Sequence, residues 1–280
     1  MNQNIRKLIT EFKRIKEKGY IKGIGNNYAS IGRTFENELK LSENTFCVPD
    51  YYGIEIKTRR AYSKSAITLF NAVPDGEELF EIERLKDTYG YPSKKDRKYK
   101  VLYIEAYGNK LNFAGIKYQY KIEVDRNLER VYLCVYDRFD RLIERKVYWS
   151  FDYLKERLTN KLQFLAIVNA WTNNIDGHNY FKYYKMDIYK LKSFDIFIDM
   201  IESGEIKTVL KIGIYLDNRR YGKTYDHGCG FAINEYSMVK LFYKLNVWFL
   251  VLNRFFCFFV FLVVVVKLAQ VGFIFYIYLY

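Results

Sequence analysis

Three residues in the segment PDYYGIEIKT (49–58) carry side chains that could do chemistry together. Asp50 and Glu55 supply two carboxylates, and Mg²⁺ prefers oxygen ligands of this kind; the peptide carbonyl of Ile56 could add a further oxygen. Such an ion lowers the pKa of a bound water and stabilises negative charge on a phosphate. Lys57 could orient or deprotonate that water, or stabilise the developing charge. The residue types fit metal-dependent hydrolysis of a phosphate ester, and they also fit an ordinary solvated strand face.

A strand hairpin over residues 46–60 would position these groups. Side chains alternate between the two faces of a strand, so Glu55, Lys57 and Arg59 share one face. The other face carries Ile54, Ile56 and Thr58. We expect the isoleucines to enter the core and the charged face to meet a cleft or water. A turn at Gly53 would bring the Asp50 carboxylate back toward Glu55.

The flanking sequence predicts helices and strands in mixed order. Apolar residues at helical spacing predict a helix over 1–18, and Thr34 is typical of a helix N-cap. Alternating segments between residues 99 and 150 predict strands in a meander. Ser150 is the expected N-cap of a helix over 150–172. Residues 207–217 and 228–236 are expected to form a strand hairpin around the polar stretch 218–227.

The charge balance indicates a polyanionic partner. The chain of 280 residues has 45 Lys and Arg against 32 Asp and Glu, a net charge of +13, and half of its residues are hydrophobic. This composition argues against disorder and is compatible with a nucleic acid or an anionic membrane surface. The four cysteines have no metal-ligand spacing, so they predict neither a zinc site nor a disulfide framework.

Residues 246–280 differ sharply from the rest of the chain. They are nearly all apolar, and about 20 apolar residues are enough for a transmembrane helix. A membrane anchor, an altered reading frame and an aggregation-prone β segment all fit. The abrupt change in composition after Leu245 favours the altered reading frame.

Four segments resemble the MvaI/BcnI family of type II restriction endonucleases and, more distantly, the nicking mismatch-repair endonuclease MutH. They are GRTFENEL (32–39), ENTFCVPDYYGIEIKTRR (43–60), SAITLF (65–70) and YDHGCGFAI (225–233). The resemblance covers roughly residues 1–245 and leaves the apolar tail without a counterpart. It implies an α/β restriction-endonuclease-like fold, with a mixed central sheet flanked by helices and two lobes around a DNA cleft.

The resemblance also implies roles for individual residues. Asp50 and Glu55 match the family's metal-binding carboxylates, Lys57 matches the catalytic lysine, and Glu36 matches an acid on a helix near the site. The segment around YDHG matches the part that reads DNA bases. The expected recognition residues are Asp217, Arg219, Arg220, Tyr225, Asp226 and His227.

The resemblance further implies a Mg²⁺-dependent enzyme that cuts double-stranded DNA at a short G·C-rich pseudopalindrome similar to CCWGG or CCSGG. We expect a cytoplasmic monomer with a cognate DNA methyltransferase as a genetic partner, and membrane association if the tail is genuine. The catalytic part would lie mainly in residues 1–140 and the recognition part in 141–245, followed by the tail at 246–280. Two alternatives stay open: a MutH-like nicking repair enzyme and a non-catalytic, membrane-tethered nucleic-acid-binding protein.

Overall fold

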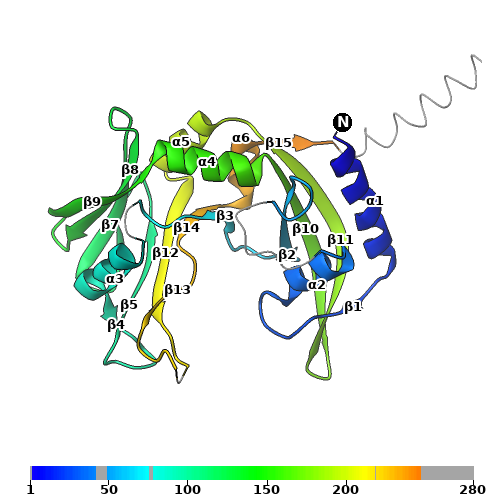
Figure 1. Ribbon diagram of the computed structural model, residues 1–280, viewed down its shortest axis with the longest axis horizontal. Coiled ribbons are helices and arrows are strands. Elements are labelled where there is room, and N and C mark those ends of the chain that lie inside the picture. Colours follow the sequence, from blue (N-terminus) through cyan, green and yellow to red (C-terminus); the bar gives the residue numbers. More distant parts are fainter. Residues whose placement is uncertain (1, 42–48, 76–77, 218, 247–280) are drawn as a thin grey trace, which may run out of the picture. The chain divides into compact units, whose positions relative to one another are not determined.

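The computed structural model describes residues 2–41, 49–75, 78–217 and 219–246 (Figure 1). The chain up to Tyr243 forms one compact unit; a second unit begins at Lys244, and only its first three residues are described. The predicted apolar tail therefore lies almost wholly outside the described residues. Within the described ranges, no helix is long and apolar enough to cross a membrane.

The first sheet contains the strand that carries Glu55 and Lys57. Its central pair, β10 and β11, is antiparallel, whereas β10 and β2 run parallel, with Leu165 paired to Glu55. Helix α1 contacts β11 and helix α2 contacts β2. The sheet order is β1 (Ile21–Lys22), β11 (His178–Leu191), β10 (Phe164–Ile175) and β2 (Glu55–Arg60), and the helices are α1 (Gln3–Glu17) and α2 (Ser30–Glu38).

The helix expected over 150–172 is too long, because it ends ten residues earlier. Helix α4 (Phe151–Leu162) is capped by Ser150, whose Oγ accepts a hydrogen bond from the amide of Tyr153 at 3.4 Å. The apolar run that follows is the central strand β10, which is covered by neighbours on both edges. A continuous apolar run has no period that separates a buried helix from a buried strand, and this ambiguity explains the error.

The prediction that Thr34 caps a helix is also wrong. Helix α2 begins at Ser30, one turn earlier. The hydroxyl of Thr34 lies inside the helix, where it donates to the carbonyl of Ser30 at 2.6 Å and accepts from the amide of Ile24 at 2.9 Å. The hydroxyl thus fastens the preceding loop to α2 instead of starting the helix.

Most of the remaining strands form two antiparallel sheets. The meander predicted between residues 99 and 150 is confirmed only for its later strands, because residues 100–106 pair in the other sheet. The mixed α/β class is confirmed, with its strands in three sheets. The second sheet has the order β3 (Ile67–Asn71), β14 (Gly230–Ile233), β12 (Ile206–Ile214), β5 (Lys100–Ala106) and β4 (Tyr91–Pro92), and β13 (Thr224–Asp226) pairs with β12. The meander is β6 (Asn112–Ala114), β7 (Tyr118–Asp125), β8 (Arg130–Asp137) and β9 (Leu142–Ser150). Other elements are α3 (Glu78–Tyr89), α5 (Phe194–Glu202), a 3₁₀ turn (Glu235–Ser237), α6 (Met238–Leu241) and β15 (Phe242–Leu245).

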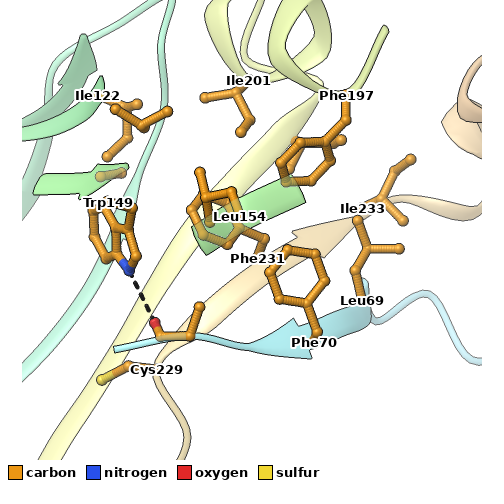
Figure 2. Packing of buried hydrophobic residues seen from close by; sticks show 14 of the residues in the cluster. Leu69, Phe70, Ile122, Trp149, Leu154, Phe197, Ile201, Cys229, Phe231 and Ile233 are labelled. Carbon is orange, nitrogen blue, oxygen red and sulfur yellow. Dashed lines mark hydrogen bonds between the residues drawn. The ribbon is translucent and has the colours of Figure 1, made fainter. Parts of the chain in front are cut away.

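A cluster of aromatic rings joins these two sheets through one hydrophobic core (Figure 2). The ring of Phe231 lies 5.6 Å from Phe70, 5.6 Å from Phe197 and 5.5 Å from Trp149, measured between ring centroids. The indole of Trp149 also donates a hydrogen bond to the carbonyl of Ala72 at 3.1 Å. Because Phe231 follows the DHGCG segment directly, this core holds one end of that segment in place.

Candidate active site and recognition loop

A two-residue turn brings Asp50 to the strand that carries Glu55. The amides and carbonyls of Tyr51 and Ile54 exchange two hydrogen bonds of 2.9 Å. The central residues Tyr52 and Gly53 have φ values of 44° and 86°, as in a type I′ hairpin turn. Beyond the turn, Asp50 Oδ2 accepts a hydrogen bond from the amide of Ile56 at 2.9 Å. The predicted return of the Asp50 carboxylate is therefore confirmed.

Replacing Gly53 by alanine should cost about 1 kcal/mol of stability, because an L-residue is strained in the left-handed region. A Cβ at this position would meet no atom within 4 Å, so the cost is that of the backbone alone. Gly177, with φ 75° and an equally open Cβ position, is the matched control in the β10–β11 turn. Urea unfolding should give similar losses for Gly53→Ala and Gly177→Ala. An unchanged midpoint for Gly53→Ala would contradict the left-handed turn.

Glu55 is buried beside two ammonium groups. Its side chain is 2% exposed, and Oε1 lies 2.6 Å from Nζ of Lys57 and 3.4 Å from Nζ of Lys161. Oε2 is buried and has no hydrogen-bond partner in the described part of the chain. Lys161 lies in the last turn of α4. It was not among the predicted site residues, because its neighbours in the sequence do not distinguish it from any other lysine at the end of a helix.

The electrostatics at Glu55 fit a site for a divalent cation. Burial raises the pKa of the Glu55 carboxyl above its ordinary value. The charge of Asp50 raises this pKa further, whereas Lys57 and, more weakly, Lys161 lower it. A cation at Oε2 would offset the burial and satisfy the unpaired oxygen. No group of three or more His, Cys, Asp or Glu side chains that could hold a metal occurs among the described residues. The donor set of Asp50 and Glu55 thus suits an ion that keeps several of its waters.

The raised pKa predicts how the stability of the metal-free protein depends on pH. The folded protein holds the Glu55 proton more tightly than the unfolded chain does. The protonated Glu55 carboxyl therefore contributes to the free energy of unfolding below the ordinary carboxyl pKa. This contribution is lost as pH rises through the higher pKa of the folded protein. In EDTA, wild type should lose stability relative to Glu55→Gln across this interval. Urea midpoints of both proteins at several pH values measure the difference, and a constant difference would contradict it.

Strand alternation predicted that Arg59 would face a cleft or water. This prediction is wrong, because the side chain is buried. Its guanidinium donates to the carbonyls of Ser63 and Ser65 at 2.7 and 2.8 Å. It also pairs with Glu235 at 2.7 Å. Arg59 therefore fastens the loop after β2, while Lys57 is the partly exposed member of this face, at 28% of its side chain.

Glu36 lies on α2 where this helix packs against β2. A Cβ built on Gly32 would be 3.4 Å from Oγ1 of Thr58 and 3.6 Å from Oε1 of Glu36. Glu36 Oε1 therefore lies near Thr58 of β2, the residue that follows Lys57. Participation of Glu36 in the chemistry stays a prediction.

The expected recognition residues are brought together around a row of rings. The guanidinium of Arg220 lies 3.8 Å from the centre of the Tyr215 ring and pairs with the Asp217 carboxylate at 2.9 Å. The Tyr215 ring is 4.4 Å from that of Tyr225, which meets the His227 ring edge-on at 4.3 Å. Arg219 is exposed in the same loop. Sequence reasoning missed Tyr215, which connects the arginine to the other rings.

His227 and Asp226 occupy different environments although they are adjacent. A Cβ on Gly213 would lie 2.5 Å from Nε2 of His227, so only glycine leaves room for the imidazole there. Partial burial lowers the pKa of His227, Asp226 opposes this, and Lys95 and Lys211 add to the lowering. Asp226 Oδ1 instead accepts hydrogen bonds within its own turn, from the amide of Gly228 and the thiol of Cys229. A role for either residue in reading DNA bases stays a prediction.

A basic surface surrounds this row of rings. Tyr221 donates a hydrogen bond to Asp96 at 3.0 Å, which joins the recognition loop to the loop before β5. Both loops carry exposed cations, and together they suit a polyanion. The exposed cations are Lys94, Lys95, Arg97, Lys98, Arg219, Arg220 and Lys223.

Comparisons with known proteins agree with this geometry. The family model described as the MvaI/BcnI restriction endonuclease family matches residues 9–243. A structure described as a complex of restriction endonuclease MvaI with cognate DNA substrate is 29% identical, with a TM-score of 0.81, and covers 88% of this chain and 98% of its own. MvaI in the absence of DNA has the same identity and coverage, with a TM-score of 0.57. A search of curated proteins found no match. The chain therefore belongs to the MvaI/BcnI restriction endonuclease family and is a site-specific deoxyribonuclease.

Proposed function

We propose that this protein is a Mg²⁺-dependent type II restriction endonuclease whose reacting centre is formed by Asp50, Glu55 and Lys57. The observation that carries the proposal is the buried Glu55 carboxylate. One of its oxygens has no partner in the part of the chain that the structure describes, and the other binds Lys57. A fixed pair of carboxylates next to a partly exposed ammonium is what metal-assisted phosphodiester hydrolysis requires.

Each residue of the centre has a distinct role. Asp50, Glu55 and the carbonyl of Ile56 would hold the ion, which supplies a water of lowered pKa and stabilises negative charge on the phosphate. Lys57 would orient that water or stabilise the charge that develops on the phosphate. Glu36 would hold a water or orient Lys57 from α2.

The substrate of the proposed reaction is double-stranded DNA with a short G·C-rich pseudopalindrome similar to CCWGG or CCSGG. Support comes from the solved structure of MvaI with its cognate DNA and from the exposed guanidinium of Arg220, which is held in place by Asp217 and Tyr215. Arginine and histidine can donate to guanine in the major groove. Arg219, Tyr225 and Asp226 complete the proposed recognition loop.

The wider organisation is also part of the proposal. The catalytic part lies mainly in 1–140 and the recognition part in 141–245, arranged as two lobes around DNA, but β10 and β11 of the later range complete the sheet that carries Glu55 and Lys57. The protein acts as a cytoplasmic monomer and has a cognate DNA methyltransferase as its genetic partner. A role of 246–280 at a membrane stays a prediction.

Cleavage of plasmid DNA by the purified full chain tests this function. Incubation with Mg²⁺ should give double-strand breaks, EDTA should prevent them, and sequencing of the ends should reveal one short target. Products nicked in one strand only would instead support a MutH-like enzyme. Binding without cleavage in Mg²⁺, with the full chain recovered in membranes, would favour a non-catalytic tethered protein.

Arg220→Ala should relax sequence preference, because a bidentate arginine–guanine contact is worth roughly 1–3 kcal/mol of discrimination. The ratio of cleavage rates between the target and a target with one G·C pair changed should fall roughly 5- to 150-fold. Arg97→Ala is the matched control, since it removes an exposed cation from the neighbouring loop. It should slow cleavage of both DNAs alike. An unchanged ratio for Arg220→Ala would remove this residue from the recognition set.

A further inference from the structure

The last turn of α4 is fixed next to the catalytic strand. Leu154, Leu158 and Leu162 form a fully buried stripe at four-residue spacing, which anchors the helix in the core. Immediately after the helix, β10 begins, and its Leu165 is the parallel partner of Glu55. Lys161 is therefore held four residues before Leu165, the strand partner of Glu55. Its Nζ lies 3.4 Å from Glu55 Oε1.

Two lysines share one carboxylate oxygen, but their positions differ. Lys57 is bound more closely, at 2.6 Å, and belongs to the same strand as Glu55. Its proposed role places its ammonium on a water or a phosphate of the DNA, which takes it away from Glu55 Oε1. A buried carboxylate that loses its partner is unfavourable unless another cation remains. Lys161 is the second cation within 4 Å of Glu55 among the described residues.

We propose that Lys161 is a positioning residue for DNA cleavage: it holds the Glu55 carboxylate through Oε1 while the ammonium of Lys57 turns to the DNA. This inference rests on the function proposed above for Asp50, Glu55 and Lys57. Lysine in a last helical turn also interacts favourably with the helix dipole. The interaction with the helix dipole does not involve Glu55. Stabilisation of the helix and positioning of Glu55 therefore make different predictions for variants of Lys161.

Lys161→Met keeps the length of the side chain and removes its charge. Mutation of groups that orient a metal ligand commonly lowers activity by about 10- to 100-fold, and we expect a loss of this size in kcat with KM unchanged. Lys161→Arg should restore most of the rate. Lys155→Met changes an exposed lysine six residues earlier on the same helix and should leave kcat unchanged.

A measurement that does not depend on cleavage separates positioning from DNA contact. In EDTA, Lys161→Met should bind target DNA as wild type does, because Lys161 contacts Glu55 and not the DNA. A double-mutant cycle with Glu55→Gln in urea unfolding should show coupling between the two residues. Weaker DNA binding with raised KM, or zero coupling, would overturn the proposal. If Lys161→Met does not fold, Lys161→Gln provides the same comparison.

The outcomes also separate this inference from the proposed function. If wild type does not cut DNA, or if Glu55→Gln cuts as wild type does, the proposed function itself fails. If wild type cuts, Glu55→Gln does not, and the uncharged Lys161 variant matches wild type in kcat, only the positioning role fails. Loss of kcat in Lys161→Met together with rescue in Lys161→Arg supports it.

Discussion

Glu55→Gln should slow DNA cleavage on the order of 10³-fold or more and leave the protein folded. Glutamine matches the size of the buried side chain, but its neutral amide cannot supply charge to a cation or bind Lys57 as a carboxylate does. Among the described residues its ion pairs are with the ammonium groups of Lys57 and Lys161, and glutamine keeps the volume that Glu55 fills. Single-turnover cleavage of plasmid DNA in Mg²⁺ measures the rate, and circular dichroism with urea unfolding checks the fold.

Glu235→Gln is the matched control for this experiment. Glu235 also pairs with a basic residue of β2, Arg59, but its own side chain is 54% exposed. The two variants make the same chemical change, each to an acid that pairs with a basic residue of β2. Glu235→Gln should cut DNA at nearly the rate of wild type. Comparable rates for wild type, Glu235→Gln and Glu55→Gln would remove Glu55 from the reacting centre.

Trp149→Ala should lower the free energy of unfolding by about 3–5 kcal/mol, as is usual when a large aromatic side chain is removed from a core. The side chain is fully buried, packs edge-on against Phe231, and donates to the carbonyl of Ala72. The cavity would lie where β9 meets β14, between two sheets, so neighbouring side chains cannot fill it by a small shift. Urea unfolding followed by circular dichroism measures the loss.

Trp149→Phe divides this loss into two contributions. Phenylalanine keeps most of the packing but leaves the Ala72 carbonyl without its donor, which should cost roughly 1–3 kcal/mol. The alanine variant should be clearly less stable than the phenylalanine variant. Equal stability of the two would mean that the hydrogen bond, and not packing, accounts for the effect of Trp149.

The hairpin of the candidate site could be predicted because its causes are local. Gly53 marks the left-handed turn, alternation places Glu55 and Lys57 on one face, and the short turn returns Asp50 to the amide of Ile56. All of these contacts lie within eight residues of sequence. The mixed α/β class was predictable for the same reason, since most helices and strands have a visible period.

The surroundings of the hairpin could not be predicted because they come from distant parts of the chain. Lys161 reaches Glu55 only because α4 ends at Leu162 and β10 begins at Phe164, and the unbroken apolar run hides that boundary. The burial of Arg59 likewise depends on Glu235 and on the loop after β2. Alternation assigns a residue to a face, but it does not say what covers that face.

The parallel pairing of β2 with β10 has a consequence for protein synthesis. The hairpin with Asp50, Glu55 and Lys57 leaves the ribosome long before β10, whose Leu165 pairs with Glu55. Contacts between segments so far apart along the chain form late in folding. A nascent chain released before Lys161 would carry the residues of the proposed reacting centre without the strand and helix that enclose Glu55. Incomplete copies of this nuclease should therefore be harmless to the DNA of the cell that makes them.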